Sequence, residues 1–365
     1  MSDSMIDDST ERLFSAHVDK AVQERVEAGE FPQALWRLAT ESGFDHALAS
    51  EDDGGIGANW SEAYGILRGI GYWQVPLPLA ETLIGSMLLS LAGIEVPDGP
   101  LTLIEQGLGN EVTAAGDGTA LRLHGTAHRV PWARHATAAV VSLEDGGIAL
   151  LDLRERQGIE LTERSNTAGL PSDSLRLNDA RVLARADAPL PALPRPVWAL
   201  GAMARSAMMV GALERVLELS VQYANDRVQF GKPIGKYQAV QQQLALLAGD
   251  VAAARVAALV AAGDAPSSRD DDHAASVFSI AVAKVRCGEA ATRGTSISHQ
   301  VHGAIGFTHE HPLHFATRRL WAWREEFGAD AWWAERLGRA AIQGGSAAFW
   351  PALTQRRFGE AQLLT

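Results

Sequence analysis

The spacing of apolar residues changes twice along the chain, and these changes limit the folds that it can form. Residues 1 to about 95 space apolar side chains at helical intervals, as in RLFSAHVDKAVQERV and PQALWRLATESGF. Between about 96 and 185, short segments such as ATAAVVSL and GIALLDL are separated by Gly, Asn and Asp, which predicts a compact antiparallel β domain. The prolines of ADAPLPALPRP then form a linker that cannot be helix interior, and long apolar stripes follow it.

The order of these patterns predicts an α+β protein in three parts. We expect an N-terminal helical domain over 1–95, a middle β domain over 96–185 and a C-terminal four-helix-type bundle over 186–365. One long helix of the bundle is expected from about Ala274 to His299.

Composition excludes several classes of function. The net charge of −12 argues against a nucleic-acid partner, because nucleic-acid binding needs a cationic surface. The single cysteine, Cys287, cannot form an internal disulfide, which fits a reducing compartment. The first residues lack a cationic region followed by an apolar one, and we find no apolar run long enough to span a bilayer. We therefore expect a cytoplasmic protein without a membrane partner.

Histidines and tryptophans gather near the C-terminus. The histidines of SHQVHGAIGFTHEHPLH fall around Gly303, Gly306 and Pro312, so turn and helix-end positions are favoured over a metal site. The tryptophans are expected in the core or in a subunit contact; they are Trp321, Trp323, Trp332 and Trp333. No phosphate loop, HExxH or paired CxxC is present in the sequence.

Two stretches place a glycine turn beside a helix end, where free backbone N–H groups can meet an anion: RVQFGKPIGKYQAVQQQLA from Arg227, and HQVHGAIGFTHEHPL from His299. The forked donors of arginine suit a diphosphate. The alternative is that Arg227 caps a helix or pairs with Asp226 or Glu218. Local physical chemistry leaves both interpretations open.

Together these two stretches resemble the C-terminal domain of the acyl-CoA dehydrogenases, and LATESGFDHALASEDDGGIG is similar to a turn in the N-terminal domain of that family. The resemblance extends over nearly the whole chain. It implies the acyl-CoA dehydrogenase fold, the cofactor FAD and an acyl-CoA substrate. It also implies a homo- or hetero-oligomer (a dimer of dimers) and an electron acceptor such as an electron-transfer flavoprotein.

In the family, one subunit reaches into its neighbour's flavin site with motifs of the type RxxFG and QxxGGxGF. The resemblance therefore implies cofactor contacts at Arg227, Gln229, Phe230 and Gln238 in the first stretch, and at Gln300, Val301, His302, Gly303 and Ala304 in the second.

The catalytic base of the family has no clear counterpart. That base is usually a glutamate before a glycine, and the position falls on Phe327, before Gly328. In some members the base lies on the first helix of the C-terminal domain, which here falls near Gly201. Weak candidates for a displaced base are Glu326 and Glu310, and the catalytic residue stays unknown.

The middle domain departs from the family as well. No counterpart of its TEPGAGSD-like flavin loop is evident in the sequence, and Trp132 is offset from the usual tryptophan contact.

These losses favour a subunit that completes a partner's FAD site, as in the heteromeric acyl-CoA dehydrogenases of bacterial steroid side-chain breakdown, which the chain resembles. In such a site a carboxylate removes the α-proton of the thioester while the β-hydride goes to the flavin. The alternatives are a homotetrameric acyl-CoA dehydrogenase with a displaced base, a flavin monooxygenase on the same fold, and a non-catalytic structural subunit. The acyl chain is not readable from the sequence.

Overall fold

The computed structural model describes residues 3–269, 275–357 and 363–364. The chain opens with a group of helices, and the pattern RLFSAHVDKAVQERV spans two of them because Asp19 starts a new helix by accepting the Val22 N–H at 2.8 Å. The helices are α1 (Asp3–His17), α2 (Lys20–Glu27), α3 (Gln33–Glu41), α4 (Trp60–Tyr72) and α5 (Leu79–Ala92), with a short 3₁₀ turn, η1 (Glu51–Asp53).

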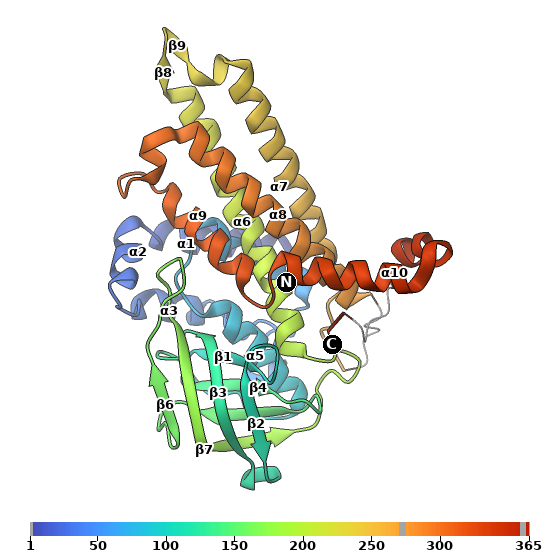
Figure 1. Ribbon diagram of the computed structural model, residues 1–365. Coiled ribbons are helices and arrows are strands. Elements are labelled where there is room, and N and C mark those ends of the chain that lie inside the picture. The colour runs from blue at the N-terminus through green and yellow to red at the C-terminus, as the bar shows by residue number, and fades with distance from the viewer. Residues whose placement is uncertain (1–2, 270–274, 358–362, 365) are drawn as a thin grey trace.

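A curled sheet follows these helices (Figure 1). Its strands are β1 (Leu101–Glu105), β2 (Glu111–Ala115), β3 (Arg122–Pro131), β4 (Ala138–Ser142), β5 (Ile148–Asp152), β6 (Ile159–Thr162) and β7 (Ser172–Ala186), with the 3₁₀ turn η2 (Gly118–Ala120). The order is β1-β4-β5-β7-β3-β2, and β6 also pairs with β7. The expected antiparallel pairing is wrong for β1 and β4, which are adjacent and run parallel. Parallel neighbours need a connection that brings the chain back to its starting end, and here that connection contains β2 and β3.

The C-terminal half is helical. It comprises α6 (Pro196–Asp226), the hairpin β8 (Val228–Gln229) and β9 (Lys232–Pro233), η3 (Ile234–Lys236), α7 (Gln238–Asp264), α8 (Ser276–His302), η4 (Gly303–Phe307), α9 (Leu313–Glu325) and α10 (Asp330–Gln355). The helix expected to end at His299 continues to His302, where Gly303 with φ 61° stops it.

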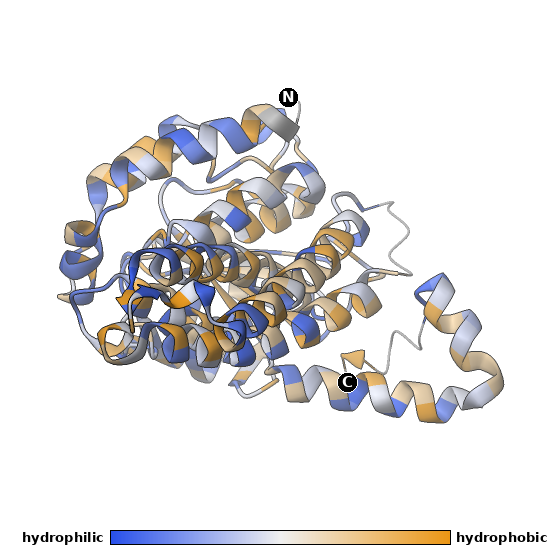
Figure 2. Ribbon diagram, turned by 90° about the horizontal axis from the view of Figure 1, so that it is seen from above, coloured by the Kyte–Doolittle hydropathy of each residue, from blue (hydrophilic) through white to orange (hydrophobic). Residues whose placement is uncertain are grey.

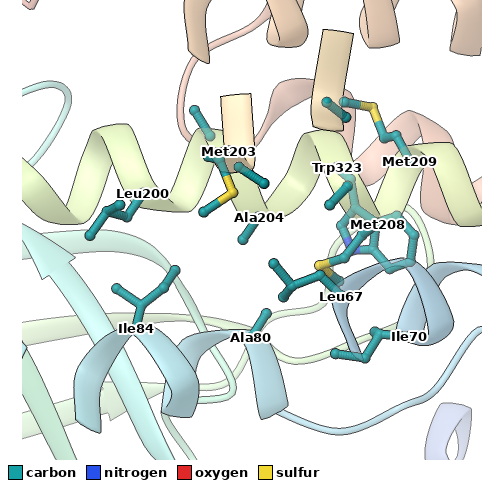
Figure 3. Packing of buried hydrophobic residues seen from close by; sticks show 14 of the residues in the cluster. Leu67, Ile70, Ala80, Ile84, Leu200, Met203, Ala204, Met208, Met209 and Trp323 are labelled. Atoms are coloured by element: carbon teal, nitrogen blue, oxygen red, sulfur yellow. The ribbon is translucent and has the colours of Figure 1, made fainter. Parts of the chain in front are cut away.

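Helix α6 contributes many residues to the largest hydrophobic core, part of which Figure 3 shows. Its Leu200, Met203, Ala204 and Met208 pack among Leu67 and Ile70 of α4, Ala80 and Ile84 of α5, and Trp323 of α9. A Cβ on Gly211 of α6 would lie 1.9 Å from the Arg68 carbonyl oxygen, so only glycine permits the contact of α6 with α4. The N-terminal helices, the bundle and one face of strands β1, β4 and β5 therefore share one core, and the other face of these strands contributes to a second.

Two helices, α6 and α7, are long and apolar enough to cross a bilayer by length and composition, so our expectation of no such run is wrong on those two criteria. The apolar window of α6 is 94% buried inside the protein, as befits a core helix. That of α7 is 33% buried, and α7 packs along α6 and α8.

Helix α10 is interrupted at Gly345, whose φ of 75° is not helical, and it extends away from the bundle (Figure 2). Of the four C-terminal tryptophans, Trp323 and Trp333 are core residues and Trp332 packs against Trp198 at 5.6 Å between ring centroids. Trp321 is 40% exposed. The expectation of core packing is therefore met by Trp323 and Trp333.

Candidate functional site

Arg227 lies at the end of α6, just before the β8–β9 hairpin. Its backbone N–H donates to the Tyr223 carbonyl at 2.9 Å, and its carbonyl accepts the Ile234 N–H at 2.9 Å. Its side chain is exposed and makes no hydrogen bond or ion pair with any of residues 3–269, 275–357 or 363–364. Glu218, the expected alternative partner, is bound instead by Arg215 at 2.8 Å. The guanidinium is thus free to bind a group outside this chain.

The neighbours of Arg227 in the first motif also face outward. Gln229, Phe230 and Gln238 are exposed, and Phe230 is 93% exposed at the tip of the hairpin with φ 51°. An aromatic ring that exposed gains nothing from the fold of its own chain, because burial is what stabilises apolar side chains. The hairpin carries a surface that the chain does not use internally.

The second motif lies beside the first. The rings of Tyr223, one turn before Arg227, and His302, the last residue of α8, stack with centroids 4.6 Å apart. Gln300, Gly303 and Ala304 are exposed, whereas the side chains of Val301 and His302 are buried within this chain. Any contact of this motif with a neighbour's cofactor would therefore come from the three exposed positions.

The histidines around this motif pack against one another. Among the residues that the structure describes, no group of three His, Cys, Asp or Glu side chains could hold a metal ion. His302 packs against His311 at 4.6 Å between centroids, and His309 packs against His314 at 5.1 Å. Burial lowers the pKa of His311 to about 4 and also lowers the pKa of His302.

A cavity of about 360 Å³ lies where the sheet meets the bundle. One wall comes from the loop after β1 and from β3, a second from the loop before β7, and a third from the start of α6 and the end of α9. Residues that line it include Glu105, Leu108, Asn110, Val130, Asn166, Trp198, Trp321, Glu326 and Phe327. The loop after β1 thus occupies a cavity wall, although its sequence shows no TEPGAGSD-like motif.

Gly201 and Phe327, the two positions that the family resemblance implies for a base, are in contact, and Phe327 lines this cavity. A Cβ built on Gly201 would lie 2.5–2.6 Å from ring carbons of Phe327, so the ring covers the Cα of Gly201. Phe327 takes φ 53°, and its ring packs against Trp198 at 6.1 Å between centroids. Neither Gly201 nor Phe327 carries a group that can remove a proton.

Glu326, the nearer candidate for a displaced base, is held in an ion network. Its carboxylate accepts the Arg205 Nε–H at 2.6 Å and the Asn166 amide at 3.0 Å. Arg205 is buried and also binds Glu81 of α5. Glu326 lines the cavity, but both of its carboxylate oxygens are already engaged, one by the Arg205 guanidinium and one by the Asn166 amide. Glu310 is exposed in the turn before α9 and is not part of the cavity wall.

Glu105 is a further acid in the cavity wall. Its carboxylate accepts the backbone N–H of Trp198 at 3.0 Å, in the first turn of α6, and Arg195 lies 3.8 Å away. Burial raises the pKa of Glu105 to about 8, although the Trp198 N–H and the Arg195 charge act in the opposite direction. Trp198 Nε1, also in this wall, has no hydrogen-bond partner among the described residues.

The cavity and Arg227 lie at opposite ends of α6. Trp198 is in the first turn of this 31-residue helix and Arg227 follows its last residue. At about 1.5 Å per residue the two are roughly 40 Å apart, a span longer than an extended FAD molecule. Figure 1 shows the same relation, with the hairpin at the end of the bundle farthest from the sheet. One FAD cannot contact both within one chain.

Sequence reasoning did not single out Glu81, Glu105, Asn166, Trp198 or Arg205. A signal was present for two of them: Arg205 is a lone cation in the apolar segment LGAMARSAMMVGAL, and Glu105 is a lone acid at the end of LTLI. Charged residues in such positions are rarely buried unless they are paired. Asn166 and Trp198 carry no comparable pattern. Trp132, which we did not assign to the flavin, is buried against Phe31 and His135.

Comparison with known proteins decides the family. Residues 199–342 match the family described as acyl-CoA dehydrogenase, C-terminal domain, and residues 2–95 match acyl-CoA dehydrogenase, N-terminal domain. The chain belongs to the acyl-CoA dehydrogenase family. Members are oxidoreductases that act on the CH–CH bond of acyl-CoA thioesters and use FAD. The predicted fold class is confirmed.

Individual relatives agree with this assignment. Acyl-CoA dehydrogenase FadE27 of Mycobacterium tuberculosis is 32% identical over 306 residues, which cover 78% of this chain and 81% of that protein. Acyl-CoA dehydrogenase IpdE2 of the same organism is 29% identical over 325 residues, which cover 86% of this chain and 89% of that protein. A chain of the ChsE4–ChsE5 complex from M. tuberculosis superposes with a TM-score of 0.83 at 25% identity, covering 94% of this chain and 98% of that one.

The described residues fit FAD in part. The free guanidinium of Arg227 beside the exposed Gln300 and Gly303 suits the diphosphate and adenosine portion. The cavity offers aromatic walls and an unsatisfied Trp198 N–H, which suit a flat heterocycle. Bound FAD would supply hydride acceptance; a base to go with it is not provided by Gly201 or Phe327.

Proposed function

We propose that this chain is the subunit of a heteromeric acyl-CoA dehydrogenase that completes the FAD site of a homologous partner without carrying the catalytic base. The observation that carries the proposal is the packing of Phe327 on Gly201, which fills both base positions with groups that cannot accept a proton. The partner would supply the carboxylate and the flavin-ring pocket, and this chain would supply Arg227 and the turn at Gly303.

The distance along α6 supports the direction of this contribution. Arg227 and the cavity of its own chain cannot contact one FAD molecule, because the helix separates them by roughly 40 Å. Arg227 has a free guanidinium, and the adjacent Phe230 is almost fully exposed. A neighbour that presents the phosphates of its FAD to this end of α6 would pair with the guanidinium of Arg227 and cover the ring of Phe230.

The likeness to a chain of the ChsE4–ChsE5 complex also supports a heteromer, since that complex contains two different chains by its name. The same reasoning makes the substrate an acyl-CoA bound largely by the partner. A cytoplasmic location and electron transfer to a flavoprotein acceptor belong to this proposal as well.

The direct test compares the chain alone with a co-expressed pair. The chain would be purified alone and with a homologous subunit, beginning with the one encoded by the neighbouring gene. Flavin absorbance per chain, oligomer mass and dehydrogenation of a panel of acyl-CoA esters would be measured. We expect little FAD and no turnover alone, and both in the complex. Stoichiometric FAD with good turnover in the isolated homomer would refute the proposal.

One rival retains specific support, because Glu326 lines the cavity. In a homotetramer with a displaced base, Glu326→Gln would abolish turnover, while Glu325→Gln, a change at the adjacent cavity residue, would not. We expect instead that neither changes the turnover of the complex by more than a few-fold. Glu310→Gln in the exposed turn is expected to have no effect on turnover.

A further inference from the structure

Three aromatic rings pack against one another where the two exposed motifs meet. Tyr223 comes from the last turns of α6, His302 from the end of α8, and His311 from the segment before α9. Tyr223 and His302 are stacked with an interplanar angle of 24°, and His311 meets Tyr223 at 6.2 Å and His302 at 4.6 Å between centroids.

This cluster is joined to the outward-facing residues through the backbone. The Tyr223 carbonyl accepts the Arg227 N–H, so the backbone of Tyr223 positions the backbone of Arg227, from which the guanidinium extends. His302 immediately precedes Gly303, and its Nδ1 lies 2.8 Å from the Ser298 carbonyl oxygen, which fixes the ring on the helix. A shift of either ring would change the separation between Arg227 and the Gly303 turn.

The burial of His302 separates this role from direct cofactor contact. Its side chain is 3% exposed, so any contact of His302 with a group outside the chain would come from its backbone. Burial keeps its pKa below the ordinary value, and the ring is therefore neutral near pH 7. A neutral ring stacks on Tyr223 without bringing an unpaired charge into the core.

We infer that His302 and Tyr223 are positioning residues, which hold Arg227 and the Gly303 turn at the spacing that a partner's FAD requires. The inference rests on the proposed function, because it concerns how the same contacts are presented. It predicts that the stacking of the ring at position 302 matters more for FAD retention than the contact of its Nδ1 with Ser298.

The test uses the co-expressed complex and substitutions at one position. In His302→Ala the stack is lost, and we expect the dissociation constant for FAD to rise at least about tenfold, followed by fluorescence of released flavin. In His302→Phe the ring is kept, and FAD retention should return to within about threefold of the parent. Tyr223→Ala and Tyr223→Phe should form a parallel pair. Urea unfolding of each variant checks that the chain is folded.

The outcomes separate the inference from the proposed function. Equal FAD retention in His302→Ala and the parent, or equal loss in His302→Ala and His302→Phe, would overturn the positioning role. Arg227→Ala is measured alongside. If that variant also retains FAD fully, the proposed function fails; if it loses FAD while His302→Ala does not, only the positioning role fails. Should His302→Ala not fold, the comparison of Tyr223→Ala with Tyr223→Phe decides.

Discussion

The ring of Phe327 lies directly against the Cα of Gly201, at the point where α6 and the end of α9 meet the cavity. Two positions far apart in the sequence, which the family resemblance implies for a base, are therefore neighbours in space. The glycine leaves room for the ring, and the two residues form one apolar contact.

This contact is sensitive to the size of the residue at position 201. Gly201→Ala would place a methyl group 2.5–2.6 Å from carbons of Phe327, and we expect the free energy of unfolding to fall by about 1–3 kcal/mol. Adding Phe327→Leu should recover part of that loss. Urea denaturation of the parent, of Gly201→Ala and of Gly201→Ala with Phe327→Leu measures these free energies of unfolding. Gly249→Ala on α7 is the control, because nothing lies within 4 Å of its added methyl, and it should stabilise by about 0.5–1 kcal/mol. A cost at Gly201 no larger than at Gly249 would contradict the prediction.

Arg205 should be among the residues that matter most for stability. It is buried between Glu81 of α5 and Glu326 after α9, and its removal leaves two carboxylates without their cation. We expect Arg205→Met to lower the free energy of unfolding by about 3–5 kcal/mol. Arg215→Met, also on α6, removes a partly exposed pair with Glu218 and should cost at most about 1 kcal/mol.

Adding Glu81→Gln and Glu326→Gln to Arg205→Met provides the internal check. Because the unpaired charges are removed, a large part of the lost stability should return. If the triple variant is no more stable than Arg205→Met, the ion network is not the cause of the loss.

Glu105 makes stability depend on pH in a defined direction. Its pKa is about 8 in the folded protein against an ordinary value of 4.5, so the folded state holds the proton more tightly. The stabilisation is complete below about pH 4.5 and is lost as pH rises toward 8, with a limiting slope of about 1.4 kcal/mol per pH unit. Glu105→Gln removes this dependence, so its stability relative to the parent should increase from pH 5 to pH 8 in urea denaturation.

The control for this pH series is Glu111→Gln, which removes an exposed carboxylate from β2 in the same domain. A Glu105→Gln difference that rises with pH no more than the Glu111→Gln difference would contradict the raised pKa of Glu105.

Arg227→Ala should weaken FAD retention in the complex and leave the stability of the isolated chain unchanged, since its side chain has no partner among the described residues. Loss of one charge-assisted contact to a diphosphate corresponds to about 1.5–3 kcal/mol, or at least about tenfold in dissociation constant. Arg37→Ala, which removes another exposed arginine on α3, should leave FAD retention intact. Unfolding of the chain with intact flavin would favour the capping interpretation instead.

The sequence predicted the order of helices and strands because periodicity and prolines act locally. It did not predict the parallel pairing of β1 with β4, since pairing depends on which strands the chain brings together after β2 and β3. Val301 and His302 were predicted as cofactor contacts by their place in a motif, yet their side chains turn into the core. Motif position fixes the backbone, and helical phase decides which side chains face out.

The parts of the site that sequence reasoning missed are long-range. Arg205 meets Glu81 and Glu326 only after three separate segments have packed, and no spacing in the sequence records that. Asn166 meets Glu326 in the same way. The contact of Phe327 with Gly201 is long-range in the same way, although counting from the two motifs had pointed to both residues.

The unpaired guanidinium of Arg227 has a genetic consequence. A side chain with no partner among the described residues of its own subunit contributes little to that subunit's folding, so damage to it would not reduce the amount of protein in the cell. On the proposed function the defect would appear in the partner's enzyme, as a mutation in one gene that inactivates the product of another. Selection on this residue would then act through the assembled pair.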